Sequence, residues 1–371
     1  MRRVDVVVIG TGAMGASTAW HLARRGCSVL AVEQFEQGHT RGSSHGGVRI
    51  FRYTYPAPYY TALTQQALPW WRVLEDEAAE TLLDLNGVYD HGRPDLLAPL
   101  ADSLQACGVP HEWLTPDEAH ARVPGLRFDT AVLHHASGGR TFAHSAVQAL
   151  VRLARHHGAE VRFECPATLR VVGDHVEVDL GDEVVWAHRA VVTAGAWVGT
   201  VLSQGVLPAD AHLPQLVVTE EQLAHYAPHD TEAVWPSFMH HTDRFRYGLF
   251  TPGEGLKVGG HHEGLVTSID ERRHEVDQAS IDEIRRYVTD WVPGVEPEPR
   301  FGATCLYTTT ANEDFVIDRV GPVVIGSPCS GHGFKFVPLV GHLLARLAAD
   351  DQGDVPVHEV VDARHRLAAF A

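Results

Sequence analysis

The chain has 371 residues, 44% of them hydrophobic and 21% charged, and its formal net charge is -17. A chain of this length favours two domains over one core. The negative charge argues against nucleic acid and anionic membranes as partners, because both would repel it. No run reaches the roughly 18 apolar residues of a membrane span. The short apolar run near the N-terminus, broken by Asp5, is typical of a first strand and not of a signal peptide.

The five cysteines are scattered and odd in number, which predicts a reducing cytoplasm and no disulfide framework. Many of the 25 histidines are adjacent, as in His134-His135, and adjacent side chains point apart on a strand or helix. We therefore expect a solvated or packing role for most of them and no metal site.

The stretch 4–33 predicts a strand, a glycine turn, a helix and a second strand, at residues 4–9, 10–15, 16–25 and 28–32. Gly10 allows the tight turn, Gly12 lets the backbone approach a pyrophosphate, and Gly15 lets the helix pack close to the strand. Glu33 follows the second strand, where a carboxylate binds ribose hydroxyls and disfavours a phosphate on that ribose. The alternative is a glycine-rich turn that binds nothing. The motif suits FAD or NAD.

The stretch 37–55 is rich in glycine and serine, and we expect no regular element in it. It contains His45, Arg49 and Arg52. One hypothesis is a solvated basic loop. The other places one guanidinium on the cofactor and one on a substrate carboxylate.

The remaining pattern predicts helices and strands in two groups. Helices are expected at 59–80, 94–107, from Thr115 (as N-cap) onward, and at 144–157, 280–291 and 337–347. Short strands and turns are expected within 81–142, and further strands at 160–164, 169–172, 176–180, 190–194, 215–220, 237–241, 244–250, 256–260, 300–307 and 322–325. The fold class is α/β with two domains. A Rossmann-type domain (1–80, 143–210 and 309–371) alternates with a β-rich substrate domain (81–142 and 211–308), and the ligand cleft lies between them.

Three stretches, 42–55, 303–318 and 330–336, together resemble the monomeric sarcosine oxidase and N-methyltryptophan oxidase family, within the D-amino-acid-oxidase-like group. They contain Gly-Ser-Ser-His-Gly-Gly, Cys-Leu-Tyr-Thr and Ser-Gly-His-Gly-Phe-Lys in turn. Element order and length are similar over essentially the whole chain. The resemblance implies an FAD-dependent amine oxidase, with FAD bound by the Rossmann-type domain.

In that family a cysteine matching Cys305 holds the flavin through a thioether, which suits an electron-poor ring. A lone cysteine is otherwise an inert buried side chain. Lys257 matches a lysine that activates dioxygen, and a fixed cation there would stabilise the charge that develops. Its alternative is a surface lysine. His261 matches an active-site histidine and Tyr247 a tyrosine over the substrate, and both alternatively pack in the core.

Arg52 and Lys335 match the pair that binds the substrate carboxylate, and the segment 331–336 leads into the last helix by the flavin. The resemblance places His45, Arg49, Lys257 and His261 among the catalytic residues and Arg52, Tyr55, Tyr247 and Lys335 at the substrate. The cofactor set is Gly10, Gly12, Met14, Gly15, Glu33, Ser43, Arg49, Cys305, Gly331, Gly333, Phe334 and Lys335.

The chain departs from the family in two places. The family has an acid at the position of Ala57, and commonly Asp-Thr at the positions of Gly47 and Val48. Loss of an acid beside an arginine predicts a substrate other than sarcosine. Met239, His240 and Phe245 near the expected cleft suit a bulkier or more polar amine.

The hypothesis is an oxidase that converts a secondary or cyclic amine of an amino acid to an imine and reduces dioxygen to hydrogen peroxide. Its partners are a small amine with a carboxylate and dioxygen, and the protein is a monomer. The alternatives are an imino-acid desaturase of a biosynthetic pathway on the same fold, a nicotinamide dehydrogenase, and a flavin-binding protein without turnover.

Overall fold

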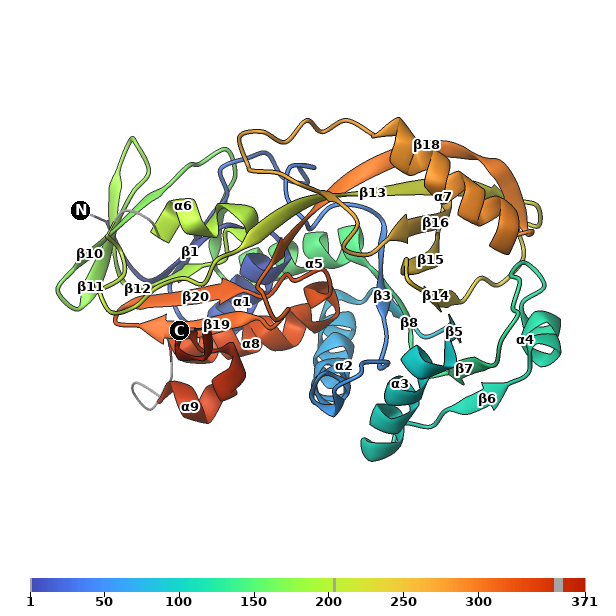
Figure 1. Ribbon diagram of the computed structural model, residues 1–371. Coiled ribbons are helices and arrows are strands. Elements are labelled where there is room, and N and C mark those ends of the chain that lie inside the picture. Colours follow the sequence, from blue (N-terminus) through green and yellow to red (C-terminus); the bar gives the residue numbers. More distant parts are fainter. Residues whose placement is uncertain (1, 203–204, 350–355, 371) are drawn as a thin grey trace.

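The computed structural model describes residues 2–202, 205–349 and 356–370. Their strands form sheets of eight, nine and three strands, and helices cover the two large sheets (Figure 1). The expected α/β class with a Rossmann-type unit is confirmed. The residues 1, 203–204, 350–355 and 371 of the expected dinucleotide-binding domain lie outside the described ranges.

The eight-stranded sheet contains the predicted strand, turn, helix and strand. Strand β1 (Arg2–Ile9) lies parallel between β2 and β12, and β9 and β20 extend the parallel part. The other strands join antiparallel at its edges. The other seven strands of this sheet are β2 (Val29–Val32), β9 (Glu160–Arg162), β10 (Thr168–Val172), β11 (His175–Asp179), β12 (Val184–Val192), β19 (Val316–Val320) and β20 (Val323–Ser327).

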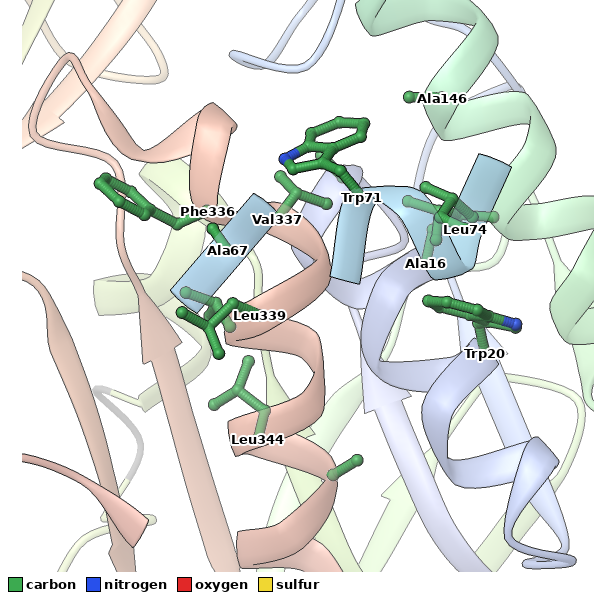
Figure 2. Packing of buried hydrophobic residues seen from close by; sticks show 14 of the residues in the cluster. Ala16, Trp20, Ala67, Trp71, Leu74, Ala146, Phe336, Val337, Leu339 and Leu344 are labelled. Atoms are coloured by element: carbon green, nitrogen blue, oxygen red, sulfur yellow. The ribbon is translucent and has the colours of Figure 1, made fainter. Parts of the chain in front are cut away.

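Four helices pack together on one face of this sheet: α1 (Ala13–Arg24), α2 (Pro58–Ala78), α5 (Ala143–His156) and α8 (Val337–Ala348). Residues of β1 alternate between two cores, with Val6 facing these helices and Val7 facing the opposite side. Trp20 of α1, Trp71 of α2 and Leu344 of α8 all belong to this helical core (Figure 2). This packing fixes the start of α1, and with it the glycine turn.

The nine-stranded sheet is built from two separate parts of the chain. Strands β13 and β18 run side by side across the molecule and link its two halves (Figure 1). One face packs on α7 (Gln278–Trp291) and α4 (Pro116–Arg122). The strands are β5 (Val88–Gly92), β6 (Glu112–Leu114), β7 (Val132–His135), β13 (Val217–Pro228), β14 (Ser237–His241), β15 (Arg246–Thr251), β16 (Gly255–Gly260), β17 (Leu265–Val266) and β18 (Val295–Thr309).

The smaller elements connect these layers. The three-stranded sheet has the order β3 (Val48–Phe51), β8 (Gly139–Phe142) and β4 (Leu83–Asp84). The other helical segments are α3 (Pro94–Ala106), η1 (Gly195–Trp197), α6 (Val198–Leu202), η2 (Gly333–Phe336), α9 (Val357–Val360), η3 (Ala363–His365) and η4 (Leu367–Phe370).

The predicted helices are all present, and Thr115 caps α4 in a capping box with Glu118, as its sequence predicts. Several strand predictions were wrong. Val48–Phe51 forms β3 inside a stretch that we expected to be irregular, because it pairs with the distant β8. Strands β13 and β18 extend well beyond their expected ends, and β19 was not expected. Polar residues such as Glu221 and His225 obscure the pattern in β13, although both are buried.

Candidate active site

A cavity of about 490 Å³ is lined by residues of both large sheets and by the loop 37–45. Its volume lies in the usual range of cofactor and ligand sites. Apart from Gly15 and Tyr55, all the predicted site residues line it. The structure therefore brings together residues that are spread from the glycine turn to the last helix.

The glycine turn has the geometry of an anion site. Gly10 has φ of 91°, which favours glycine. A Cβ on Gly15 would lie 1.9 Å from the carbonyl oxygen of Gly10, so helix and strand approach too closely for any side chain. Gly12 is the N-cap of α1, and the first N–H groups of this helix, which have no partner within the helix, suit an anion. The hydroxyl of Thr11 is buried without a hydrogen-bond partner among the described residues. The turn therefore fits a dinucleotide pyrophosphate.

Glu33 lies directly after β2 and is 7% exposed. Its Oε2 accepts a hydrogen bond from the backbone N–H of Thr11 at 3.0 Å, and its Oε1 accepts one from Phe35 at 3.3 Å. Each carboxylate oxygen has a second lone pair, so both retain capacity for ribose hydroxyls. Glu33 is also the only acidic residue among the described residues that line the cavity.

Arg49 organises the loop between β2 and β3. Its guanidinium donates to three backbone carbonyls, those of Val48 at 2.9 Å, Ser43 at 3.0 Å and His45 at 2.6 Å. The hydroxyl of Ser43 donates in turn to the carbonyl oxygen of Leu306 at 2.7 Å, which ties the loop to β18. The loop is thus held as part of the cavity wall.

His45 is neutral at physiological pH. Burial, and then the nearby Arg49, lower the pKa of its imidazole to about 3. Its Nε2 is buried without a hydrogen-bond partner among the described residues. Because His45 lines the cavity, this nitrogen is available to a ligand there.

Lys257 of β16 and Cys305 of β18 both line the cavity. The Nζ of Lys257 donates to the carbonyl oxygen of Val48 at 3.4 Å. Burial, and then Arg49, lower the pKa of Lys257 to about 7. Burial raises the pKa of the Cys305 thiol, while Arg49 and Lys257 oppose that rise. The two cations therefore favour the thiolate at an otherwise apolar position.

Arg52 and Lys335 converge from distant parts of the chain. Lys335 is 4% exposed, and burial and then Arg52 lower its pKa well below 10.5. Arg52 can lower the pKa of Lys335 only if the guanidinium and the ammonium lie close together. A carboxylate that entered this part of the cavity would favour the charged form of Lys335. The pair has the composition of an anion clamp.

Tyr55, which we expected at the substrate, does not line the cavity. It is 6% exposed, and its hydroxyl accepts a hydrogen bond from Lys335 Nζ at 2.8 Å. The Tyr55 hydroxyl also bonds with Nδ1 of His332 at 3.1 Å. Tyr55 therefore contacts the clamp and not the cavity.

The other wall near the clamp is aromatic. His261 Nδ1 lies 3.3 Å from the hydroxyl of Tyr307, and burial lowers the pKa of His261 well below 6.5. A Cβ on Gly331 would lie 2.6 Å from the Tyr307 ring, which explains the glycine. Burial raises the pKa of Tyr247, so its phenol stays neutral. Neutral aromatic groups thus surround the charged pair.

Sequence reasoning missed some cavity residues and misplaced one. Tyr307 and His332 line the cavity, and both lie within the motifs at Cys305 and Lys335, so a signal was present. Gln148 of α5 also lines it without any such signal. His240 was expected near the cleft, but it does not line the cavity. Its ring stacks on that of His91, with the two ring centres 4.0 Å apart. It lies on the opposite face of β14 from Met239, which does line the cavity.

The glycine turn and its cavity define a dinucleotide-binding protein, and comparison with known proteins gives its family. A family model described as FAD dependent oxidoreductase matches residues 5–347. The chain belongs to this family, and its cofactor is FAD. This match decides between FAD and NAD, which the glycine turn alone left open.

The similar proteins fall within the predicted group. The chain is 31% identical to monomeric sarcosine oxidase from Bacillus sp. (strain NS-129), over 93% of this chain and 92% of that one. It is 28% identical to N-methyl-L-tryptophan oxidase from Shigella dysenteriae serotype 1 (strain Sd197), over 95% and 96%. The solved structure of NikD, described as an unusual amino acid oxidase essential for nikkomycin biosynthesis, has a TM-score of 0.85 and 26% identity, covering 97% of this chain and 98% of that one. The predicted family is confirmed.

Proposed function

We propose that the protein is an FAD-dependent oxidase of a secondary or cyclic amine of an amino acid. The amine becomes an imine, and dioxygen becomes hydrogen peroxide. The convergence of Arg52 and Lys335 in the FAD cavity carries this proposal, because two cations beside a redox cofactor suit a substrate that bears a carboxylate.

When bound, FAD would supply the two-electron oxidation of the amine carbon and the transfer of those electrons to dioxygen. Arg52 and Lys335 hold the substrate carboxylate, which fixes the α-carbon in the cavity. Tyr247 and His261 pack against the rest of the substrate. The charged form of Lys257 stabilises the negative charge that develops as dioxygen is reduced.

The substrate nitrogen reacts as the neutral amine, because its lone pair assists loss of the hydride equivalent. His45, His261 and His332 are all kept neutral by burial and by nearby cations. The surrounding charges thus disfavour a cationic substrate nitrogen and favour its deprotonated form. The ratio kcat/KM is expected to rise with pH until the substrate amine is neutral.

We further propose that Cys305 binds the flavin covalently as a thioether. The C–S bond would replace one S–H and one C–H bond, with dioxygen as the acceptor of the two electrons and two protons released. Burial raises the pKa of the Cys305 thiol, and Arg49 and Lys257 support this step because both oppose that rise and so favour the reactive thiolate. His45 and Arg49 complete the same wall of the cavity.

The expected domain division remains part of the proposal, and the sheets support it. Described strands of the eight-stranded sheet fall in 1–80, 143–210 and 309–371, and those of the nine-stranded sheet in 81–142 and 211–308, apart from the last residue of β18. We also propose a cytoplasmic monomer. Its five cysteines are free, and no helix within the described ranges has the length and apolarity that a membrane crossing requires.

The decisive experiment is a panel of N-alkyl and cyclic amino acids with the purified holoenzyme. At least one member is expected to bleach the flavin anaerobically and to produce peroxide stoichiometrically in air. A matched set of the same amines without the carboxylate is the control, and these are expected to react poorly. If no member of the panel bleaches the flavin, the oxidase proposal fails and the inactive flavin-binding alternative is favoured.

A second candidate function is oxidation of an imino acid in a biosynthetic pathway. The structural likeness to NikD favours it, because that protein is described as an amino acid oxidase of nikkomycin biosynthesis. Product mass separates the two. Desaturation keeps all the carbon and nitrogen of the substrate, whereas oxidation of an N-alkyl amino acid followed by hydrolysis of the imine divides it.

A further inference from the structure

Tyr55 lies between the two cations of the clamp and contacts both. The guanidinium carbon of Arg52 is 4.4 Å from the centre of the Tyr55 ring. The Nζ of Lys335 donates to the Tyr55 hydroxyl at 2.8 Å and is 5.3 Å from the same ring centre. One buried side chain therefore bonds to Lys335 through its oxygen and to Arg52 through its ring face.

The hydrogen bonds of Lys335 leave one donor for a ligand. When an incoming carboxylate holds Lys335 in its charged form, the lysine has three N–H groups. One donates to the Tyr55 hydroxyl and a second to the carbonyl oxygen of His332, at 2.7 Å. The third remains for the cavity that Lys335 lines. The position of this donor depends on the two acceptors that hold the ammonium.

His332 fixes the direction of the Tyr55 hydroxyl. Because that oxygen accepts from Lys335, its own proton is free to go to Nδ1 of His332, 3.1 Å away. Nδ1 then acts as an acceptor, so His332 is neutral and carries its proton on Nε2, which lies 3.2 Å from the carbonyl oxygen of Glu313. Burial lowers the pKa of His332 well below 6.5, in agreement with this assignment.

No carboxylate separates the two cations. Within the described ranges, the Arg52 guanidinium has no ion pair or side-chain hydrogen bond, and residue 57 is alanine. An acid beside Arg52 would hold the guanidinium but would also neutralise part of the clamp and compete with an incoming anion. A neutral tyrosine holds both cations and leaves their charge for the ligand. Burial raises the pKa of Tyr55, so it stays neutral.

We propose that Tyr55 is the positioning residue of the anion clamp: its ring face places Arg52, its hydroxyl places Lys335, and His332 orients that hydroxyl. The proposal rests on the proposed function only in taking the clamp as the carboxylate site. Tyr55 itself does not touch the ligand. It acts through the two cations, and its loss is expected to weaken recognition of the carboxylate selectively.

The test is a titration of the holoenzyme with benzoate and, as the neutral match, benzamide, followed by the flavin absorbance. Tyr55→Phe keeps the ring and removes the hydroxyl, so benzoate affinity is expected to fall about tenfold, in line with loss of one hydrogen bond to a charged group. Tyr55→Leu removes both the ring contact with Arg52 and the hydroxyl contact with Lys335, so benzoate affinity is expected to fall about a hundredfold. Benzamide affinity is expected to change less than threefold in either variant.

His332 provides the second pair of variants. His332→Asn keeps an acceptor near the position of Nδ1 and is expected to stay within about threefold of the wild type for benzoate. His332→Leu removes the acceptor and is expected to resemble Tyr55→Phe. If Tyr55→Leu does not fold, Tyr55→Phe and the two His332 variants still decide the question.

The outcomes separate this inference from the proposed function. A selective loss of benzoate affinity supports the inference even if no amine is oxidised. Unchanged benzoate affinity in Tyr55→Phe overturns it, even if the enzyme oxidises amines. Equal losses for benzoate and benzamide also overturn it, because they indicate a general disturbance of the cavity. Absence of benzoate binding by the wild type overturns it as well.

Discussion

Lys257 donates from Nζ to the backbone carbonyl oxygen of Val48 at 3.4 Å and so joins β16 to β3. Because Val48 precedes Arg49, this contact brings two cations to the same cavity. Burial is the larger cause, and Arg49 the second, of a Lys257 pKa of about 7. The ammonium is therefore present below pH 7 and is lost as the pH rises through that value.

The rate at which dioxygen reoxidises the reduced enzyme is expected to follow this titration. It should be higher at pH 6 than at pH 8, since only the charged form of Lys257 stabilises developing negative charge. Lys257→Gln is expected to lower the rate about 100- to 1,000-fold and to remove the pH dependence. Stopped-flow absorbance of the reduced enzyme mixed with oxygen measures it. Lys257→Arg is the control, because arginine keeps its positive charge across this pH range. If the pH dependence of the rate persists in Lys257→Gln, the titration belongs to another group.

The covalent bond proposed for Cys305 has two internal controls. Cys165 and Cys329 also line the cavity. Acid precipitation of the wild type is expected to give a yellow pellet, whereas Cys305→Ala is expected to leave all of its flavin in the supernatant. Cys329→Ala and Cys165→Ala should retain the yellow pellet. A colourless wild-type pellet rules out the bond, and a colourless pellet from one control variant alone assigns it to that other cysteine.

The local features of the fold could be predicted from the sequence because their causes are local. The turn around Gly10 and Gly15 is fixed by close backbone approach, and the cap at Thr115 by one hydrogen bond with Glu118. Strands β13 and β18 were only partly predicted. Their length depends on pairing with each other across the chain, and buried polar residues such as Glu221 do not alternate with apolar ones.

The sequence motifs named most of the residues that line the cavity, but they could not tell which of the expected residues lie behind that lining. Neighbouring positions in a sequence do not show which face of a strand lies toward the cavity. His240 was therefore expected on the wrong face of β14. Tyr55 is close to Arg52 in the sequence and contacts both Arg52 and Lys335. It nevertheless does not line the cavity. The contact between His332 and Tyr55 depends on the docking of η2 against the start of α2, which no local pattern encodes.

The close approach of α1 to β1 predicts a sharp difference between two glycine substitutions. Gly15→Ala would place a Cβ 1.9 Å from the carbonyl oxygen of Gly10, so the helix must shift. We expect a loss of about 1–3 kcal/mol of stability and a lower FAD content. Gly199 in α6 is the matched control, because a Cβ added there would have no neighbouring atom within 4 Å. Gly199→Ala is expected to leave the Tm unchanged or raise it slightly, since alanine favours helix. Equal Tm and FAD content in both variants would contradict this account.

The charges that line the cavity predict which substrate side chains the enzyme rejects. Arg49, Arg52, Lys257 and Lys335 all line it, and Glu33 is the only acid among its described lining residues. A positive group on the substrate would enter a buried site without a counter-ion, which costs several kcal/mol. N-methyl-norleucine and N-methyl-lysine have side chains of similar length but differ in charge. We expect kcat/KM for the lysine derivative to be at least about a hundredfold lower at neutral pH, and the gap to narrow as the pH approaches the pKa of its side chain. Peroxide release measures both rates. Equal rates at neutral pH would require an acid at the substrate end of the cavity, where none of the described lining residues provides one.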